Sequence, residues 1–64
     1  MSFQLYEVWT EDDDGHQELL ETTASLTGAK KIAQKAIEDG AYSATIYQET
    51  EDGDTKEIQR VEAD

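Results

Sequence analysis

His16 and the acidic residues before it are the side chains whose types could support proton-transfer chemistry. His16 is the only histidine, and Asp12, Asp13 and Asp14 stand close to it in the sequence. A histidine beside carboxylates can act as a general acid or base. The chain has no cysteine, and no partner nucleophile or oxyanion motif accompanies His16. We therefore interpret His16 as a solvated turn residue and expect no catalytic residue and no enzymatic activity.

The segment from Thr10 to Glu21 partly matches the calcium-binding loop of helix–loop–helix proteins. Asp12, Asp14 and Gly15 take the third, fifth and sixth positions of that pattern, and Glu21 takes the twelfth. The first position, usually Asp, is Thr10, and the flanking residues are typical of strands rather than helices. A hairpin turn explains this segment better, so we expect no metal site and no cofactor.

Net charge restricts the partners of the chain. Sixteen Asp and Glu face five Lys and Arg, which gives a formal net charge of -11. Such a field repels nucleic acid and anionic membranes, and it attracts basic protein surfaces. No apolar run is longer than Leu19-Leu20, and the start lacks the pattern of a secretory signal. We expect no direct contact with nucleic acid or membrane and a cytoplasmic location.

Four strand-like segments surround one helix-like segment. Residues 3–10 and 16–23 are typical of strands, and the acidic run 11–15 between them ends in Asp-Gly, a hairpin signal. Residues 42–50 and 55–62 repeat this arrangement around a second acidic turn at 51–54. Ser25 is a suitable N-cap for a helix with apolar residues at 26, 29, 33, 36 and 37, and Gly40 is a suitable left-handed cap at its end.

This element order predicts one small α+β domain that spans residues 1–64. The first and third strands are the more apolar, whereas the second and fourth are half charged. Central strands need apolar side chains on both faces, and edge strands tolerate charge. The sequence therefore predicts a ββαββ fold with a four-stranded antiparallel sheet in the order 2-1-3-4 and the helix on one face.

One helix cannot cover both faces of such a sheet. Alternation places Tyr6 and Val8 with Ala44 and Ile46 toward the helix. We then expect Leu5, Trp9 and Tyr47 on an open face that is rimmed by Glu7 and Glu49, with Trp9 partly exposed. Phe3 and Leu5 conflict with this alternation, which leaves open that Trp9 packs in the core through a bulge.

The helix that lies between the two hairpins carries Ser-Leu-x-x-Ala-Lys-x-x-Ala, at Ser25, Leu26, Ala29, Lys30 and Ala33. With this motif between two β-hairpins, the chain resembles small acidic phage and mobile-element proteins of the anti-CRISPR kind. The resemblance covers most of the chain and lies in capping and helix-packing residues. It implies an inhibitor that blocks a nucleic-acid-handling complex by binding it, with an acidic surface in place of phosphates. Such proteins share no binding motif, so the resemblance assigns no site residue.

We expect a non-enzymatic inhibitor or adaptor that docks on a basic protein surface as a partial nucleic-acid mimic. The alternative is a structural or accessory domain that self-associates into a homodimer through its open sheet face, with acidity serving only solubility. The expected partner-binding residues are the acids of the two turns and the apolar residues of the open face, namely Glu11, Asp12, Asp13, Asp14, Glu49, Glu51, Asp52, Asp54, Leu5, Trp9 and Tyr47.

Overall fold

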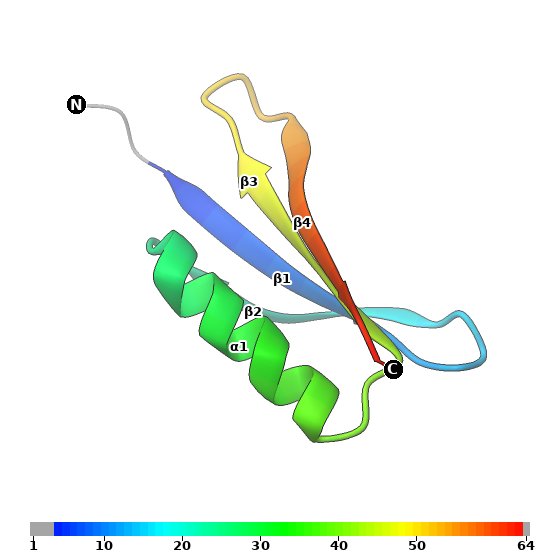
Figure 1. Ribbon diagram of the computed structural model, residues 1–64. Coiled ribbons are helices and arrows are strands. Elements are labelled where there is room, and N and C mark those ends of the chain that lie inside the picture. The colour runs from blue at the N-terminus through cyan, green and yellow to red at the C-terminus, as the bar shows by residue number, and fades with distance from the viewer. Residues whose placement is uncertain (1–3, 64) are drawn as a thin grey trace.

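A computed structural model describes residues 4–63 and shows the expected ββαββ order (Figure 1). All strand pairs are antiparallel, and the sheet order is β2-β1-β3-β4, as the sequence predicts. Phe3 lies outside the described residues. The elements are β1 Leu5–Glu11, β2 Gln17–Thr23, α1 Leu26–Glu38, β3 Ser43–Glu49 and β4 Thr55–Glu62.

Both ends of α1 are capped by the residues expected from the sequence. The Ser25 hydroxyl accepts a hydrogen bond from the Gly28 backbone N–H at 3.1 Å, which satisfies one of the free donors of the first turn. At the other end, Gly40 has a φ of 113°. Its N–H donates to the Ile37 carbonyl at 3.1 Å, and the Ala41 N–H donates to the Ala36 carbonyl at 3.0 Å. These two bonds form a Schellman cap, which requires a positive φ at Gly40.

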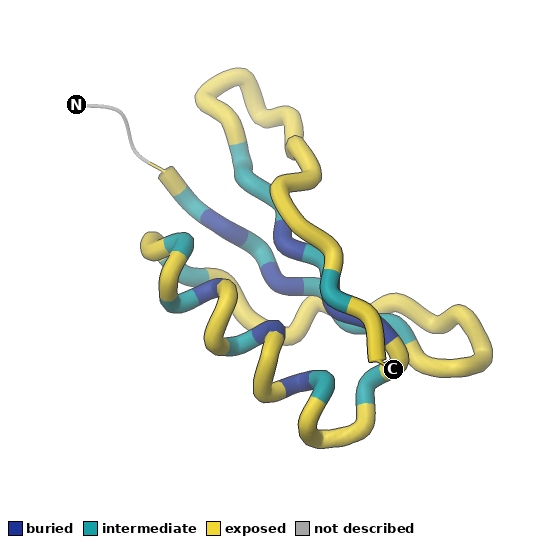
Figure 2. Tube along the Cα trace, in the orientation of Figure 1, coloured by how far each residue is buried: buried dark blue, intermediate teal, exposed yellow. Residues whose placement is uncertain are grey.

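The core lies between α1 and the two central strands. Val8 and Ile46 are fully buried and pair with each other across β1 and β3. The helix meets them with alanines, of which Ala29 and Ala33 are fully buried. Alanine leaves little side chain between a helix and a sheet, so α1 packs close to the strands. Figure 2 shows that the buried stretches are confined to α1, β1 and β3.

Each edge strand contains a bulge next to this central pair. The pairing of β2 with β1 shifts between Val8 and Trp9 and leaves Leu20 without a partner. The pairing of β4 with β3 shifts between Ile46 and Tyr47 and leaves Ile58 without a partner. A bulge adds one residue to one strand and changes the alternation beyond it. The bulges are therefore in the edge strands, and the alternation of β1 and β3 continues without interruption.

The two hairpins have the same backbone arrangement, and this similarity includes their turns. In each turn the glycine N–H donates to the carbonyl three residues earlier, from Gly15 to Asp12 at 3.1 Å and from Gly53 to Thr50 at 3.0 Å. Both glycines have positive φ, 86° and 88°. Val8 corresponds to Ile46 and also pairs with it. The sheet therefore has a pseudo-two-fold axis at this pair.

Replacing Gly40 by Ala should lower the free energy of unfolding by about 1 kcal/mol. Among residues 4–63, no atom outside its neighbours lies within 4 Å of the position that a Cβ would take, so the loss comes from the backbone conformation alone. Urea unfolding of the two proteins measures the difference. Unchanged stability would show that the cap does not hold a positive φ in solution.

Replacing Ile46 by Val should destabilise the protein by about 1 kcal/mol, because one buried methylene is lost and a small cavity remains. Ile58→Val is the matched control, because it removes the same methylene from a side chain of β4 that is 36% exposed. Its effect on urea unfolding should be less than half as large. Equal losses would contradict a core centred on the Val8–Ile46 pair.

Candidate functional site

The sheet face opposite α1 carries the apolar residues that the sequence predicted for it. Leu5, Trp9 and Tyr47 alternate with the buried residues of β1 and β3, and all three are partly exposed. No helix or strand formed by residues 4–63 lies over this face, as Figure 1 shows. The alternative prediction, that a bulge turns Trp9 into the core, is wrong. The bulge beside Trp9 lies in β2, so the alternation of β1 is not changed by it. We call this surface the open face.

Carboxylates surround the aromatic residues of the open face. Glu7 pairs with Tyr47 across the strands, and Tyr47 pairs with Glu57 on its other side. The register places five acids on this face, namely Glu7, Glu11, Glu49, Glu57 and Glu62. Cross-strand neighbours on one face lie close enough for their side chains to interact. The two aromatic rings therefore lie in a strongly negative surrounding.

Arg60 is the only base that the register places on the open face among the described residues. Its Nη2 lies 3.7 Å from Glu11 Oε2, and its Nε lies 3.3 Å from Glu62 Oε1. The charge of Arg60 is therefore already matched by two carboxylates. Sequence reasoning did not select Arg60 or Glu57, because their common face depends on the β4 bulge at Ile58.

Trp9 and Glu7 form a fixed pair beside a shallow hollow. The indole N–H of Trp9 donates to Glu7 Oε1 at 3.0 Å, and both residues are partly buried. Together with Tyr47, they line a hollow of about 360 Å³ whose other borders are Gln17 and Thr55. The hollow thus presents two aromatic rings and a carboxylate whose orientation is set by a hydrogen bond.

The acids of the first turn have different roles. Asp12 Oδ1 accepts the backbone N–H groups of Asp14 at 3.0 Å and His16 at 2.9 Å, so Asp12 stabilises the turn. Asp13 and Asp14 are exposed. His16 is exposed as well, and its Nδ1 lies 3.9 Å from Asp12 Oδ2. Carboxylate oxygens of the three aspartates lie within 4.8 Å of one another, and no further ligand from the described part of the chain joins this exposed cluster.

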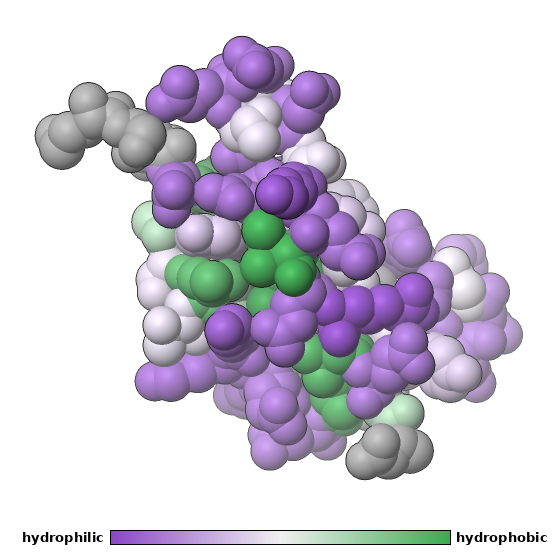
Figure 3. All heavy atoms as spheres, turned by 45° about the horizontal axis from the view of Figure 1, so that its top comes forward, coloured by the Kyte–Doolittle hydropathy of each residue, from purple (hydrophilic) through white to green (hydrophobic). Residues whose placement is uncertain are grey.

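The second turn is similar, but there a threonine side chain, rather than an aspartate side chain, forms the hydrogen bond to the turn backbone. Thr50 stands where Asp12 stands in the first turn, and its hydroxyl donates to the Asp54 carbonyl at 3.1 Å. Glu51, Asp52 and Asp54 are exposed, and Figure 3 shows hydrophilic side chains gathered over this end of the molecule. The two turns lie at opposite ends of a molecule that is 38 Å long (Figure 1). The structure therefore does not bring the two acidic turns together.

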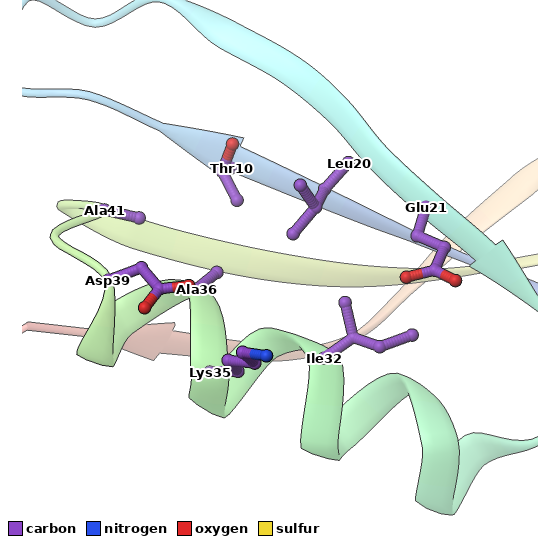
Figure 4. Close-up of a pocket in the computed structure, with 8 residues that line it drawn as sticks. All are labelled: Thr10, Leu20, Glu21, Ile32, Lys35, Ala36, Asp39 and Ala41. Atoms are coloured by element: carbon purple, nitrogen blue, oxygen red, sulfur yellow. The ribbon is translucent and has the colours of Figure 1, made fainter.

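A second hollow, which the sequence did not predict, lies on the other side of the sheet, between β2 and α1. Leu20 points from the β2 bulge toward Ile32 on the helix, and the two side chains form its apolar centre (Figure 4). This hollow, which we call the groove beside α1, has a volume of about 390 Å³. Its other lining residues are Thr10, Glu21, Lys35, Ala36, Asp39 and Ala41.

Trp9 fluorescence should report the negative surrounding of the open face, because Trp9 is the only tryptophan. Neutral acrylamide should quench it, and at low salt the ratio of caesium to iodide quenching should exceed the ratio for free tryptophan, since the carboxylates attract cations and repel anions. The difference should decrease at high salt, where the charges are screened. Glu7→Gln should raise quenching by iodide. A ratio equal to that of free tryptophan at low salt, or an emission that no quencher reaches, would contradict the assigned face.

Within residues 4–63, no helix has the length and apolar character needed to cross a membrane. The chain matches no protein-family model, and comparison with the curated proteins and with the solved structures gave no match either.

Proposed function

We propose that this chain is a non-enzymatic acidic protein that binds a basic, nucleic-acid-binding surface of a partner protein. The observation that carries the proposal is the open face, where two aromatic residues lie among five carboxylates and the only base from residues 4–63 is already paired. Aromatic residues are frequent binding hot spots, and carboxylates around them favour a basic partner. In this role the chain acts as an inhibitor of the anti-CRISPR kind in the cytoplasm.

The mimicry of nucleic acid is partial. A duplex as long as this molecule, 38 Å, carries about 22 phosphate charges, because each charge takes up about 1.7 Å of helix axis. The chain has a net charge of -11, about half of that number. The acids proposed for binding are also divided between two distant turns and the open face, and others, such as Glu21 and Glu38, lie elsewhere. Charge alone therefore provides attraction and orientation, and the aromatic residues supply the contact that holds the complex.

Self-association through the open face is the second candidate function, because that face is not covered by any described element. In a two-fold dimer each open face meets an identical copy of itself. Five acids and one base would then face the same set of charges, which opposes association at low salt. High salt should strengthen such a dimer by screening and should weaken binding to a basic partner. Sedimentation at two salt concentrations distinguishes the two functions.

Capture from a host lysate at low salt, followed by competition with DNA or RNA, tests the proposed function. We expect the captured partner to bind nucleic acid and to release this protein when its own nucleic acid is added. Simultaneous binding of both without mutual loss of affinity would contradict mimicry. The acidic residues would then only be solvated surface residues with no role in binding.

Two sets of substitutions should affect different rate constants of that complex. Replacing exposed Asp13 and Asp14 by Asn should slow association several-fold at low salt and reduce its salt dependence, since rim charges act on encounter. Trp9→Ala should speed dissociation about tenfold or more, as expected for an aromatic hot spot. The matched control is the double variant Glu21→Gln, Glu38→Gln, which removes the same charge away from the open face. An equal effect of the control on association would show that only net charge matters.

A further inference from the structure

The hollow on the open face combines the chemical groups that bind an arginine side chain. Trp9 and Tyr47 provide two aromatic rings, and Glu7 provides a carboxylate next to both, as the cross-strand partner of Tyr47 and two residues before Trp9 in β1. The hydrogen bond from the Trp9 indole N–H uses one acceptor position of Glu7 Oε1. A carboxylate has about four lone-pair positions on its two oxygens, so Glu7 can accept further donors while it keeps this bond.

The same face already holds one guanidinium from its own chain. Arg60 lines a small hollow of about 50 Å³ together with Trp9, Tyr47 and Glu57. Its guanidinium also lies near Glu11 and Glu62. A guanidinium beside aromatic rings and carboxylates is therefore compatible with the packing of this face. The larger hollow at Glu7 offers the same kinds of groups, and Arg60 forms no border of it.

We propose that this hollow binds one arginine side chain of the basic partner, with the guanidinium stacked against Trp9 and Tyr47 and donating hydrogen bonds to Glu7. This inference rests on the proposed function and names the type of partner side chain that the open face prefers to bind. The charge of the face, five acids with one paired base, is complementary to such an occupant.

Arginine fits this hollow better than lysine does. A guanidinium is planar, so it can lie on an aromatic ring and still direct two N–H groups in its plane toward one carboxylate. It is also less strongly hydrated than an ammonium, so less hydration is lost on entering a half-buried hollow. Lysine would be attracted by the net charge alone. The open face should therefore distinguish two peptides of equal charge.

Two peptides of equal length and charge, one an arginine–glycine repeat and the other a lysine–glycine repeat, test the inference. Binding is followed by isothermal titration, so that Trp9 variants can be compared, and circular dichroism confirms that each variant is folded. We expect the arginine peptide to bind about two- to fivefold more tightly than the lysine peptide, the range expected for a cation on an exposed aromatic ring. Trp9→Ala should remove most of this preference.

Glu7→Gln and Glu21→Gln form the matched pair, because each removes one carboxylate. Glu7 is on the open face, whereas Glu21 lines the groove beside α1. Glu7→Gln should weaken the arginine peptide at least threefold more than Glu21→Gln does. Equal affinities of the two peptides, or equal losses in the two variants, would overturn the arginine site and leave the acidic docking function standing. Failure of both peptides to bind at low salt would contradict the docking function as well.

Discussion

A sheet has two faces, and the 13 residues of α1 can cover only one of them. This constraint determines how the small chain distributes its apolar side chains. On the covered face, alanines of the helix pack on Val8 and Ile46, so a core is formed with few large residues. On the other face, Trp9 and Tyr47 are shielded only in part, by neighbouring side chains of the same sheet. The surface proposed for binding is thus a direct result of having one helix for four strands.

The acidic residues are not equally available, although they contribute equally to the net charge. Asp12 is engaged with the backbone of its own turn, and Glu11 lies beside Arg60. Asp13 and Asp14 project from the same turn without such a role in it. A formal charge of -11 therefore describes the long-range field, whereas the carboxylates that a partner can contact are a smaller and more specific set.

Much of the fold could be predicted because its signals are local. Ser25 starts the helix through a hydrogen bond that its side chain accepts from the Gly28 N–H. Gly40 ends the helix, and Gly15 and Gly53 form the turns, through a positive φ that few other residues adopt. The bulges could not be predicted, because a strand with one extra residue has the same composition as one without it. The face shared by Arg60, Glu57 and the aromatic residues depends on the bulge in β4. Leu5, Trp9 and Tyr47 with the acids Glu7, Glu11 and Glu49 were thus foreseen, whereas Arg60, Glu57 and Glu62 of β4 were not.

The pseudo-two-fold axis at Val8 and Ile46 has a consequence for the order of folding. Each hairpin is closed by a short turn, and hairpins of this kind form within about 1–10 μs. The β1–β3 pairing joins segments that are separated in sequence by β2 and α1, so its closure entropy is much larger. An isolated hairpin has only marginal stability in water. We therefore expect the rate-limiting step of folding to be the pairing of β1 with β3, which joins the two hairpins and packs them against α1.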